Sequence, residues 1–289
     1  MKGKIIGIVV LMLVTTTVVS ATNINVKEKI QPKSSSVDVP VWQKGDSWTY
    51  NYHEIKYRYD TNGTLWYTCY FNNTETLTVT DDTGSNYTVK WTSINNEGRA
   101  TIGKIRLKFT PFTKFSGELI VRKTDLAALR ESDQEKGFAF WLIGNIGFPI
   151  PTQYLHFREW IYTPAWVTLP FPMTAGASGT FPGLSYTYQE KCYLYGGLFK
   201  LFDWPAQSYT NSPIGYHCEM ANITTPAGNF NAYNASVETT YGLGHYFCWR
   251  YYVPEVGNLA KIYFSSDWDT NGNPGTIFGS ELVSTTYTP

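Results

Sequence analysis

Acidic, histidine and cysteine side chains are the groups of this chain that could do chemistry, and their spacing matches no established catalytic motif. The sequence contains 23 Asp and Glu, four His and four Cys. It has no G-x-S-x-G elbow, H-E-x-x-H pair, phosphate loop or dinucleotide fingerprint. A sugar hydrolase needs two carboxylates roughly 5–10 Å apart. The glutamates considered for that role are Glu159, Glu190, Glu219 and Glu238. Scattered strand carboxylates are usually solvated, so the sequence favours a protein that is not an enzyme.

One loop has the spacing of an oxygen-ligand calcium site. Asp267, Asp269 and Asn271 alternate ahead of Gly272, in the order in which such a loop begins to wrap a hard cation. Phe278 stands at the position where the loop needs a bidentate glutamate. The pattern therefore favours a polar hairpin turn over calcium at these residues.

The four cysteines are predicted to form two disulfides. An even number of cysteines in an exported chain favours disulfide pairing. The strand phase predicts that Cys218 and Cys248 point outward on neighbouring strands, which would pair them and leave Cys69 with Cys192. Zinc is the alternative, because His217 adjoins Cys218. Adjacent residues of a strand point to opposite faces, so zinc is disfavoured and no cofactor is predicted.

The N-terminal segment predicts export. A short basic start precedes an apolar run over residues 5–19, and Ala21 ends a small-residue cleavage pattern. Residues 1–21 are therefore predicted to be a signal peptide, with an uncleaved membrane anchor as the alternative. Residues 22–39 lack periodicity and are expected to be a flexible linker. The mature protein is expected to be secreted or held at the cell surface.

Five N-x-S/T sequences are candidate glycosylation sites in a secretory setting. All five are expected on turns or on the outward phase of strands. The acceptors are Asn62, Asn72, Asn86, Asn222 and Asn234.

Composition favours an extracellular β protein without a nucleic-acid partner. The formal net charge is zero, so there is no electrostatic basis for binding nucleic acid. Tyrosine, threonine and valine form a strand-favouring mixture. Tyr87, Val89 and Trp91 alternate with polar neighbours, as in a strand with one covered face. The predicted fold class is mainly β, with a large curved antiparallel sheet that is half-barrel or β-sandwich-like.

One short helix is predicted near residues 125–136. Thr124 is placed to cap its start and Gly137 to end it. Leu126 and Leu129 would lie on its packing face.

Residues 40–289 are predicted to form a single β-rich domain. A faint similarity between residues 40–50 and 170–181 suggests the alternative of two similar β halves. Those halves would cover about 40–150 and 151–289.

The middle of the chain is apolar and rich in proline, over residues 138–151 and 160–173. Proline disfavours central strands, and the hydrophobicity disfavours free exposure to solvent. One interpretation is a buried strand followed by edge segments, and the other is the lining or lid of a cavity for an apolar ligand. The candidate lining residues are Phe138, Phe140, Trp141, Trp160 and Trp166.

Two blocks near the ends of the domain resemble a known group of proteins. The closing block has the motif Pro226-Ala227-Gly228-Asn229-Phe230 followed by the corner Tyr251–Gly257 and Lys261, and the opening block contains Gly45-Asp46-Ser47-Trp48. This arrangement is similar to uncharacterised exported β-rich proteins of bacteria and archaea. The resemblance implies a curved antiparallel sheet akin to lipoprotein-carrier (LolA-like) half-barrels. Its motifs are turn and core residues, so it implies fold rather than function.

The sequence therefore predicts a non-catalytic exported protein that binds an apolar ligand, such as a lipid, or an envelope partner in its curved sheet. A structural or adhesive surface protein is the alternative, and a secreted carbohydrate-active hydrolase is the second alternative. The sequence predicts no oligomeric state.

Overall fold

The computed structural model describes residues 36–60, 62–102, 105–109, 113–143, 150–267, 269 and 271–289. The predicted signal peptide lies outside these ranges, as does the predicted linker up to residue 35. The next residues form β1 (Ser36–Val37), which pairs with β9 (Met173–Thr174). The folded part of the chain therefore begins before residue 40, the start predicted from sequence. No helix in the described ranges is long and apolar enough to cross a membrane.

Fifteen strands form one antiparallel sheet, which confirms the mainly β prediction. Their order is β10 (Ser178–Phe181), β13 (Ile214–Thr225), β14 (Gly228–Tyr241), β15 (Gly244–Val253), β16 (Asn258–Asp267), β17 (Pro274–Thr285), β2 (Ser47–Tyr59), β3 (Leu65–Asp81), β4 (Asn86–Ile102), β5 (Ile105–Phe109), β7 (Ala128–Ile143), β8 (Ile150–Trp166), β11 (Leu184–Leu194) and β12 (Phe199–Asn211). β6 (Lys114–Arg122) also pairs with β4 and β7. Because β7 and β8 pair across residue 150, the two predicted halves share one sheet.

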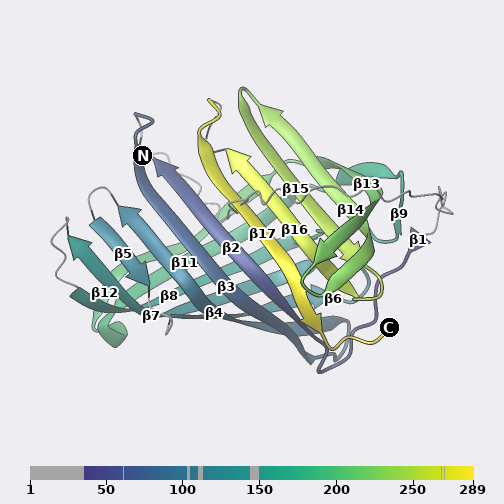
Figure 1. Cartoon of the computed structure of the whole chain (residues 1–289), viewed down its shortest axis with the longest axis horizontal. Coiled ribbons are helices and arrows are strands. Elements are labelled where there is room, and N and C mark those ends of the chain that lie inside the picture. The colour runs from purple at the N-terminus through teal and green to yellow at the C-terminus, as the bar shows by residue number, and fades with distance from the viewer. Residues whose placement is uncertain are drawn as a thin grey trace, which may run out of the picture.

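The sheet bends into two walls whose strands cross (Figure 1). The first wall comprises β13 to β17 with β2 and β3, and the second wall comprises β6, β7, β8, β11 and β12. The long strand β4 lies at the bend, because it pairs with β3 on one side and with β5 and β6 on the other. In Figure 1 the first wall runs diagonally in front, and the teal and green strands of the second wall cross behind it.

The main apolar core contains both sequence blocks of the resemblance. Trp48 is fully buried, and its indole N–H donates to the carbonyl oxygen of Val256 at 2.8 Å. The indole N–H of Trp42 donates to the carbonyl oxygen of Gly257 at 2.7 Å. Gly257 has a φ of 65°, which favours glycine. The opening block therefore fastens to the corner between β15 and β16, and the residues of both blocks are structural.

The helix predicted at residues 125–136 is wrong, because this segment is a turn followed by strand β7. Leu126 has a φ of 55°, and its N–H donates to the carbonyl oxygen of Arg122 at 2.8 Å. Asp125 closes the turn by accepting from the Arg122 guanidinium at 2.5 Å and from the N–H of Ala127 at 3.1 Å. β6 and β8 flank β7 and bond its backbone on both sides. Tertiary pairing thus overrides the local helix signal.

Two strands form the edges of the sheet. β10 has only four residues. β12 is longer and contains Pro205 at an irregularity in its pairing with Tyr188–Glu190 of β11. Leu198, which precedes β12, is 80% exposed, and Phe199, the first residue of β12, is 62% exposed. The long edge thus combines exposed apolar residues with a proline that removes one backbone donor.

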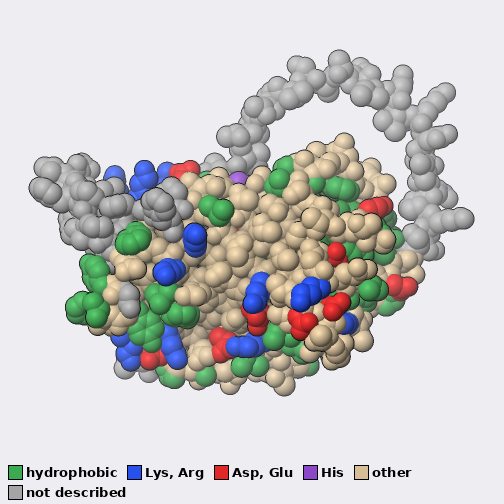
Figure 2. Space-filling view, turned by 90° about the horizontal axis from the view of Figure 1, so that it is seen from below, with side chains coloured by type: hydrophobic (Ala, Val, Ile, Leu, Met, Phe, Trp, Pro, Cys, Tyr) green, Lys and Arg blue, Asp and Glu red, His purple; other side chains and the backbone are tan. Residues whose placement is uncertain are grey.

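Charged side chains on the face drawn in Figure 2 are of mixed sign. Lys and Arg side chains lie beside Asp and Glu side chains there, and the formal net charge of the chain is zero. Such a face offers no single-sign field to a partner.

Candidate functional site

The inner face of the second wall carries three rows of side chains that cross the strands. Glu131, Asp133 and Glu135 alternate along β7, so all three point to the same side. The residues in register with them extend the rows across the neighbouring strands. The rows are Val79, Val89, Leu119, Glu131, Trp160 and Tyr188; Leu77, Trp91, Gly117, Asp133, Arg158 and Glu190; and Glu75, Ser93, Phe115, Glu135, His156 and Cys192.

A cavity of about 850 Å³ lies between the two walls. This volume is in the range of small-molecule sites. Its outer end is marked by the exposed lining residues Trp166, Asn211 and Ser212, and its inner end by the buried Glu54 and Lys56. The aromatic lining residues are Tyr52, Phe71, Trp91, Phe115, Trp160, Trp166, Tyr162, Phe181, Tyr186, Tyr188, Tyr209, Tyr246 and Phe264.

Four aromatic rings form a continuous cluster near the outer end of the cavity, which we call the mouth cluster. The ring centroid of Trp166 lies 5.4 Å from that of Tyr162, which lies 6.2 Å from that of Tyr186. Tyr186 stacks on Tyr209 with a centroid distance of 5.3 Å. The mouth cluster offers flat apolar surface with hydroxyl groups at its margins.

Two ion pairs occupy the inner part of the cavity. Arg158 Nε donates to Asp133 Oδ1 at 2.8 Å across β7 and β8, and both side chains are nearly buried. Lys56 Nζ donates to Glu54 Oε2 at 2.8 Å on the first wall. Burial alone would lower the pKa of Arg158, but the charges of Asp133 and Glu135 raise it above its ordinary value. Both cations are therefore neutralised by the protein's own carboxylates.

A buried histidine sits between two carboxylates beside this region. His156 Nε2 lies 2.6 Å from Glu190 Oε1, and Nδ1 lies 3.6 Å from Glu135 Oε2. The Tyr154 hydroxyl donates to Glu135 Oε1 at 2.6 Å. Burial opposes charge on the imidazole, but hydrogen bonds to Glu135 and Glu190 raise its pKa above the ordinary value. The same contacts lower the pKa of both carboxyls against the effect of burial. The triplet therefore favours an imidazolium between two carboxylates.

Two further glutamates line the cavity, and their pKa values are raised rather than lowered. Burial raises the pKa of Glu75 to about 8, and the charges of Glu54 and Glu131 add to the rise. Burial, followed by the charge of Asp133, raises the pKa of Glu131 to about 7. The Tyr162 hydroxyl donates to Glu131 Oε2 at 3.3 Å. Both carboxyls therefore titrate near neutral pH in a partly apolar space.

Four polar atoms of the cavity lining lack a hydrogen-bond partner within the described ranges: Asn73 Oδ1, Glu54 Oε1, the Tyr188 hydroxyl and Arg250 Nη1. The two carbonyl-type acceptors among them are Asn73 Oδ1, on a side chain only 3% exposed, and Glu54 Oε1, on one 5% exposed. Both residues line the cavity. Buried polar atoms are almost always satisfied, so these acceptors mark a place where a ligand would find partners.

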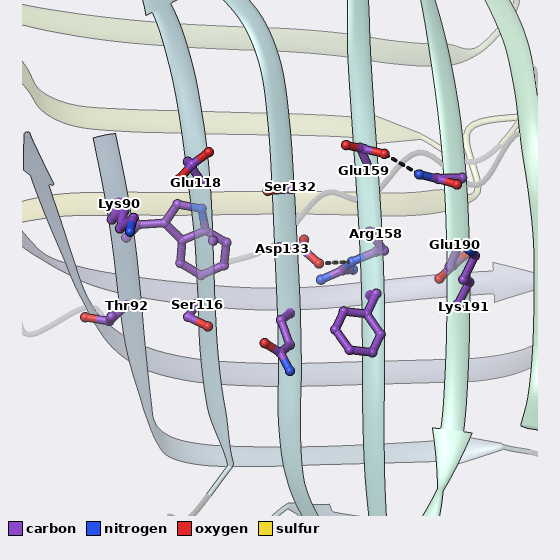
Figure 3. A pocket seen from close by; sticks show the side chains of 15 residues that line it. Lys90, Thr92, Ser116, Glu118, Ser132, Asp133, Arg158, Glu159, Glu190 and Lys191 are labelled. Atoms are coloured by element: carbon purple, nitrogen blue, oxygen red, sulfur yellow. Dashed lines mark hydrogen bonds and ion pairs between the residues drawn. The ribbon is translucent and has the colours of Figure 1, made fainter. Parts of the chain in front are cut away.

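A groove of about 570 Å³ crosses the outer face of the second wall (Figure 3). One rim holds Lys90, Glu118, Ser132, Glu159 and Gln189, and the other holds Thr92, Ser116, Gln134, Phe157 and Lys191. Side chains of the row between them, including Asp133 and Arg158, alternate with the rims and turn inward. The rim residue Glu159 is bound by Arg130 at 2.6 Å and by Gln189. The rim polar groups thus pair with one another or meet solvent.

Gly117, on the strand between the groove and the cavity, allows a close approach of its neighbours because it has no side chain. A Cβ at Gly117 would lie 2.3 Å from the carbonyl oxygen of Ser132 and 2.4 Å from Nε1 of Trp91. The indole of Trp91 therefore lies directly over the backbone of β6, on the cavity side.

The five residues predicted to line a ligand cavity lie in different places. Trp160 and Trp166 line the cavity. Phe138 is 42% exposed and is not among the cavity residues. The side chains of Phe140 and Trp141 lie outside what the structure describes. Most of the lining comes instead from strands of both walls, and it mixes rings with charges, so the cavity is amphiphilic rather than apolar.

The candidate calcium loop is a hairpin turn between β16 and β17. Asp269 accepts from the N–H of Asn271 and from Nδ2 of Asn273, both at 2.9 Å. Asp267 accepts from the N–H of His245 at 2.8 Å. The carboxylates of Asp267 and Asp269 are thus already hydrogen-bonded to the protein itself. Within the described ranges no cluster of three or more His, Cys, Asp or Glu side chains is arranged to hold a metal ion.

One of the five candidate glycosylation sites departs from the expected outward phase. Asn234 is only 4% exposed, and its Nδ2 donates to Glu219 Oε1 at 3.3 Å. Residues 232–235 of β14 are buried on both faces, so the outward phase is covered there as well. The other four acceptors are exposed or half-buried: Asn62, Asn72, Asn86 and Asn222.

The predicted disulfide between Cys218 and Cys248 is absent, because one strand lies between the two residues. Cys218 is in register with Ala235 and Cys248 with Val237, on opposite sides of β14. Two strand spacings amount to roughly 9.6 Å, whereas bonded cysteines have Cα atoms about 4.4–6.8 Å apart. Both thiols are free and buried rather than outward-facing.

The predicted disulfide between Cys69 and Cys192 is absent as well. Cys69 lies on the first wall and Cys192 on the second. Their pKa values are raised to about 12 and about 11, mainly by burial and in part by the charge of Glu135. Both thiols therefore stay protonated at neutral pH.

The sequence did not predict the carboxylates that meet in the cavity. Of the four glutamates considered for hydrolysis, Glu190 reaches the inner face, where His156 holds it. Glu75 and Glu131 were not singled out. A signal existed in the period-two spacing of Glu131, Asp133 and Glu135, which becomes visible once the segment is taken as a strand.

No protein-family model, curated protein or solved structure matches this chain.

Proposed function

We propose that this protein is a non-catalytic exported protein that binds a small amphiphilic ligand in the cavity between its two walls. The observation that carries the proposal is the composition of that cavity. It joins the aromatic mouth cluster to an inner end where Asn73 Oδ1 and Glu54 Oε1 lack partners. Unpaired buried acceptors cost stability, and a bound ligand with donor groups would offset that cost.

The ligand would place its apolar part against the mouth cluster and its polar group at the inner end. This narrows the apolar ligand expected from the sequence to one with both characters. A fully apolar molecule would leave the inner acceptors unpaired, and a fully polar one would gain little from the rings.

Export is part of the proposal and rests on residues 1–21 and on the linker that follows them. A ligand-holding curved sheet also agrees with the proposed likeness to LolA-like carriers, which rests on the opening and closing blocks.

The proposal is tested with N-phenyl-1-naphthylamine, an uncharged ring-bearing dye that fluoresces in apolar sites. We expect saturable binding at one site, and we expect Trp166→Ala to weaken it about tenfold, because the mouth cluster loses its exposed ring. The control is Trp204→Ala, since Trp204 is similarly exposed, at 40%, but lies on β12 outside the cavity lining. Unsaturable binding, or equal loss in both variants, would contradict the proposal.

A secreted carbohydrate-active hydrolase is the second candidate. It is favoured by the two carboxyls, Glu75 and Glu131, whose raised pKa values fit a proton donor. The proposed binding function predicts no turnover of 4-nitrophenyl glycosides at pH 5–8. Release of nitrophenol by the wild-type protein that is lost in Glu131→Gln would instead establish the hydrolase.

A further inference from the structure

We propose that Glu75 and Glu131 form a subsite for a cationic nitrogen, so that the cavity ligand is a small amphiphilic amine whose binding releases protons. The inference rests on the proposed binding function and names the class of its ligand. Four features of the cavity support it.

The first feature is position. Glu75 lies on β3 of the first wall, beside Tyr50 and Ser93, and Glu131 lies on β7 of the second wall, beside Leu119. Both side chains line the same cavity, and the charge of Glu131 acts on Glu75. A cationic group lodged between the walls near Glu75 would therefore lie in the field of both carboxylates.

The second feature is the arrangement of the cavity's own cations. Lys56 is bound to Glu54 at 2.8 Å, and Arg158 is bound to Asp133 at 2.8 Å. The third lining cation, Arg250 on β15, lies with its guanidinium carbon 5.9 Å from the centroid of the Phe181 ring, and its charge is not among those that act on Glu75 or Glu131. Within the described ranges no salt bridge reaches Glu75 or Glu131. Two ionised carboxylates in a desolvated space repel each other, and neither has a salt-bridge partner there, so the pair is electrostatically complementary to a positive charge from outside.

The third feature is the set of free acceptors around the pair. A primary ammonium has three N–H donors, so a good site supplies about three acceptors. Asn73 lies two residues before Glu75 on the same face of β3, and its Oδ1 is unpartnered. Glu54 Oε1 is a second unpartnered acceptor in the same cavity. An alcohol has one donor and would satisfy fewer of these atoms.

The fourth feature is the proton balance. In the free protein both carboxyls hold protons near neutral pH, because their pKa values are raised. An ammonium ion arriving between them keeps its own proton, and the carboxyl protons leave to solvent. The charged and titratable groups that surround the pair are Tyr50, Tyr52, Glu54 and Lys56 on β2, Asp133 on β7, and Arg158 and Tyr162 on β8.

The test compares two fluorescent probes, one with and one without a terminal ammonium group. Dansylcadaverine carries a primary ammonium on a five-carbon chain, and N-pentyl dansylamide has the same ring and chain without it. At pH 8 we expect the amine to bind the wild-type protein at least about tenfold more tightly. We expect Glu75→Gln/Glu131→Gln to abolish that preference. Glu118→Gln, which removes a carboxylate from the outer groove, is the control and should keep it.

The outcomes separate this inference from the proposed function. Equal binding of the two probes overturns the amine subsite and leaves the ligand-binding function standing. A preference for the amine probe that survives in the double variant has the same two consequences. If neither dansyl probe nor the uncharged naphthylamine binds, both proposals are wrong.

A measurement on the wild-type protein keeps the test decisive should the double variant not fold. Calorimetric titration at pH 7 in buffers of different ionisation enthalpy reports the protons exchanged on binding. We expect dansylcadaverine to release about one to two protons per molecule bound, and the neutral analogue to release none. The absence of proton release with the amine contradicts the inference.

Discussion

Replacing Arg158 with methionine is expected to lower the free energy of unfolding by about 3–5 kcal/mol, as when one partner of a buried ion pair is removed. The guanidinium holds Asp133 at 2.8 Å, and both side chains are about nine-tenths buried. Its charge also lowers the pKa of Glu54, Glu131 and Glu135. Removal therefore leaves several carboxylates without the cation that offsets them. Urea denaturation at pH 7 measures the loss.

A matched control separates burial from charge. Arg130→Met removes a guanidinium from the outer face, where Arg130 is 45% exposed beside Glu159. That change should cost at most about 1 kcal/mol, as for other exposed pairs. Adding Asp133→Leu to the Arg158 variant should restore much of the lost stability, because the pair is then replaced by apolar groups. Similar losses in the two single arginine variants would show that the inner pair is not desolvated.

Stability is expected to be greatest near pH 5–6 and to fall by several kcal/mol as the pH rises to 9. Glu75 and Glu131 have folded-state pKa values of about 8 and about 7, above the ordinary value of 4.5. Between pH 4.5 and 8 the folded state therefore keeps protons that the unfolded chain has released. The stabilisation from these carboxyls is present below pH 4.5 and is lost as the pH rises through their folded pKa values. A carboxyl whose pKa is higher by one in the folded state than in the unfolded chain contributes about 1.4 kcal/mol to this loss.

The dependence of stability on pH at acid pH follows from His156 and its two carboxylate partners, Glu135 and Glu190. The pKa of Glu135 and of Glu190 is lowered, so their stabilisation is present above pH 4.5 and is lost as the pH falls below it. His156 has a raised pKa, so it stabilises the fold below pH 6.5 and loses this effect as the pH rises. Denaturation midpoints from pH 4 to 9 give the profile.

The double variant Glu75→Gln/Glu131→Gln tests whether these two carboxyls cause the loss of stability at alkaline pH. Without the two titrating carboxyls, stability between pH 6 and 9 should fall much less steeply, with the remaining slope due to groups such as His156 whose pKa is also raised, whereas Glu118→Gln should keep the wild-type slope. A steep alkaline loss that persists in the double variant would assign it to other groups.

The class of fold was predictable from sequence because it depends on a repeated local pattern. Segments such as Tyr87–Trp91 alternate apolar and polar residues, and this period alone gives a strand with one covered face. The segment at 125–136 was not predictable in this way. Its helix-favouring residues and its capping pattern are local, whereas the hydrogen bonds that make it a strand come from β6 and β8.

The candidate site was less predictable than the fold, for a physical reason. Carboxylates are rarely buried, so three of them at period two on β7 do not resemble a core face. Their burial makes sense only with Arg158 and His156, which lie on the next strand, about 25 residues further along the chain. The partner of Glu75 in the cavity, Glu131, belongs to the opposite wall. Such contacts between the two walls depend on how the sheet bends, which no local sequence pattern predicts.

Because the sheet has two edges, each copy of the chain has two strands with unpaired backbone N–H and C=O groups, to which a second copy could add a strand. β10 offers only four residues, too few to hold a second chain well. β12 offers thirteen, but Pro205 and the irregular pairing opposite Tyr188–Glu190 break the template near its middle. The open sheet that leaves room for a cavity thus also leaves two unpaired edges, which favour aggregation. On the longer edge, β12, Pro205 interrupts the backbone donors that another chain would pair with.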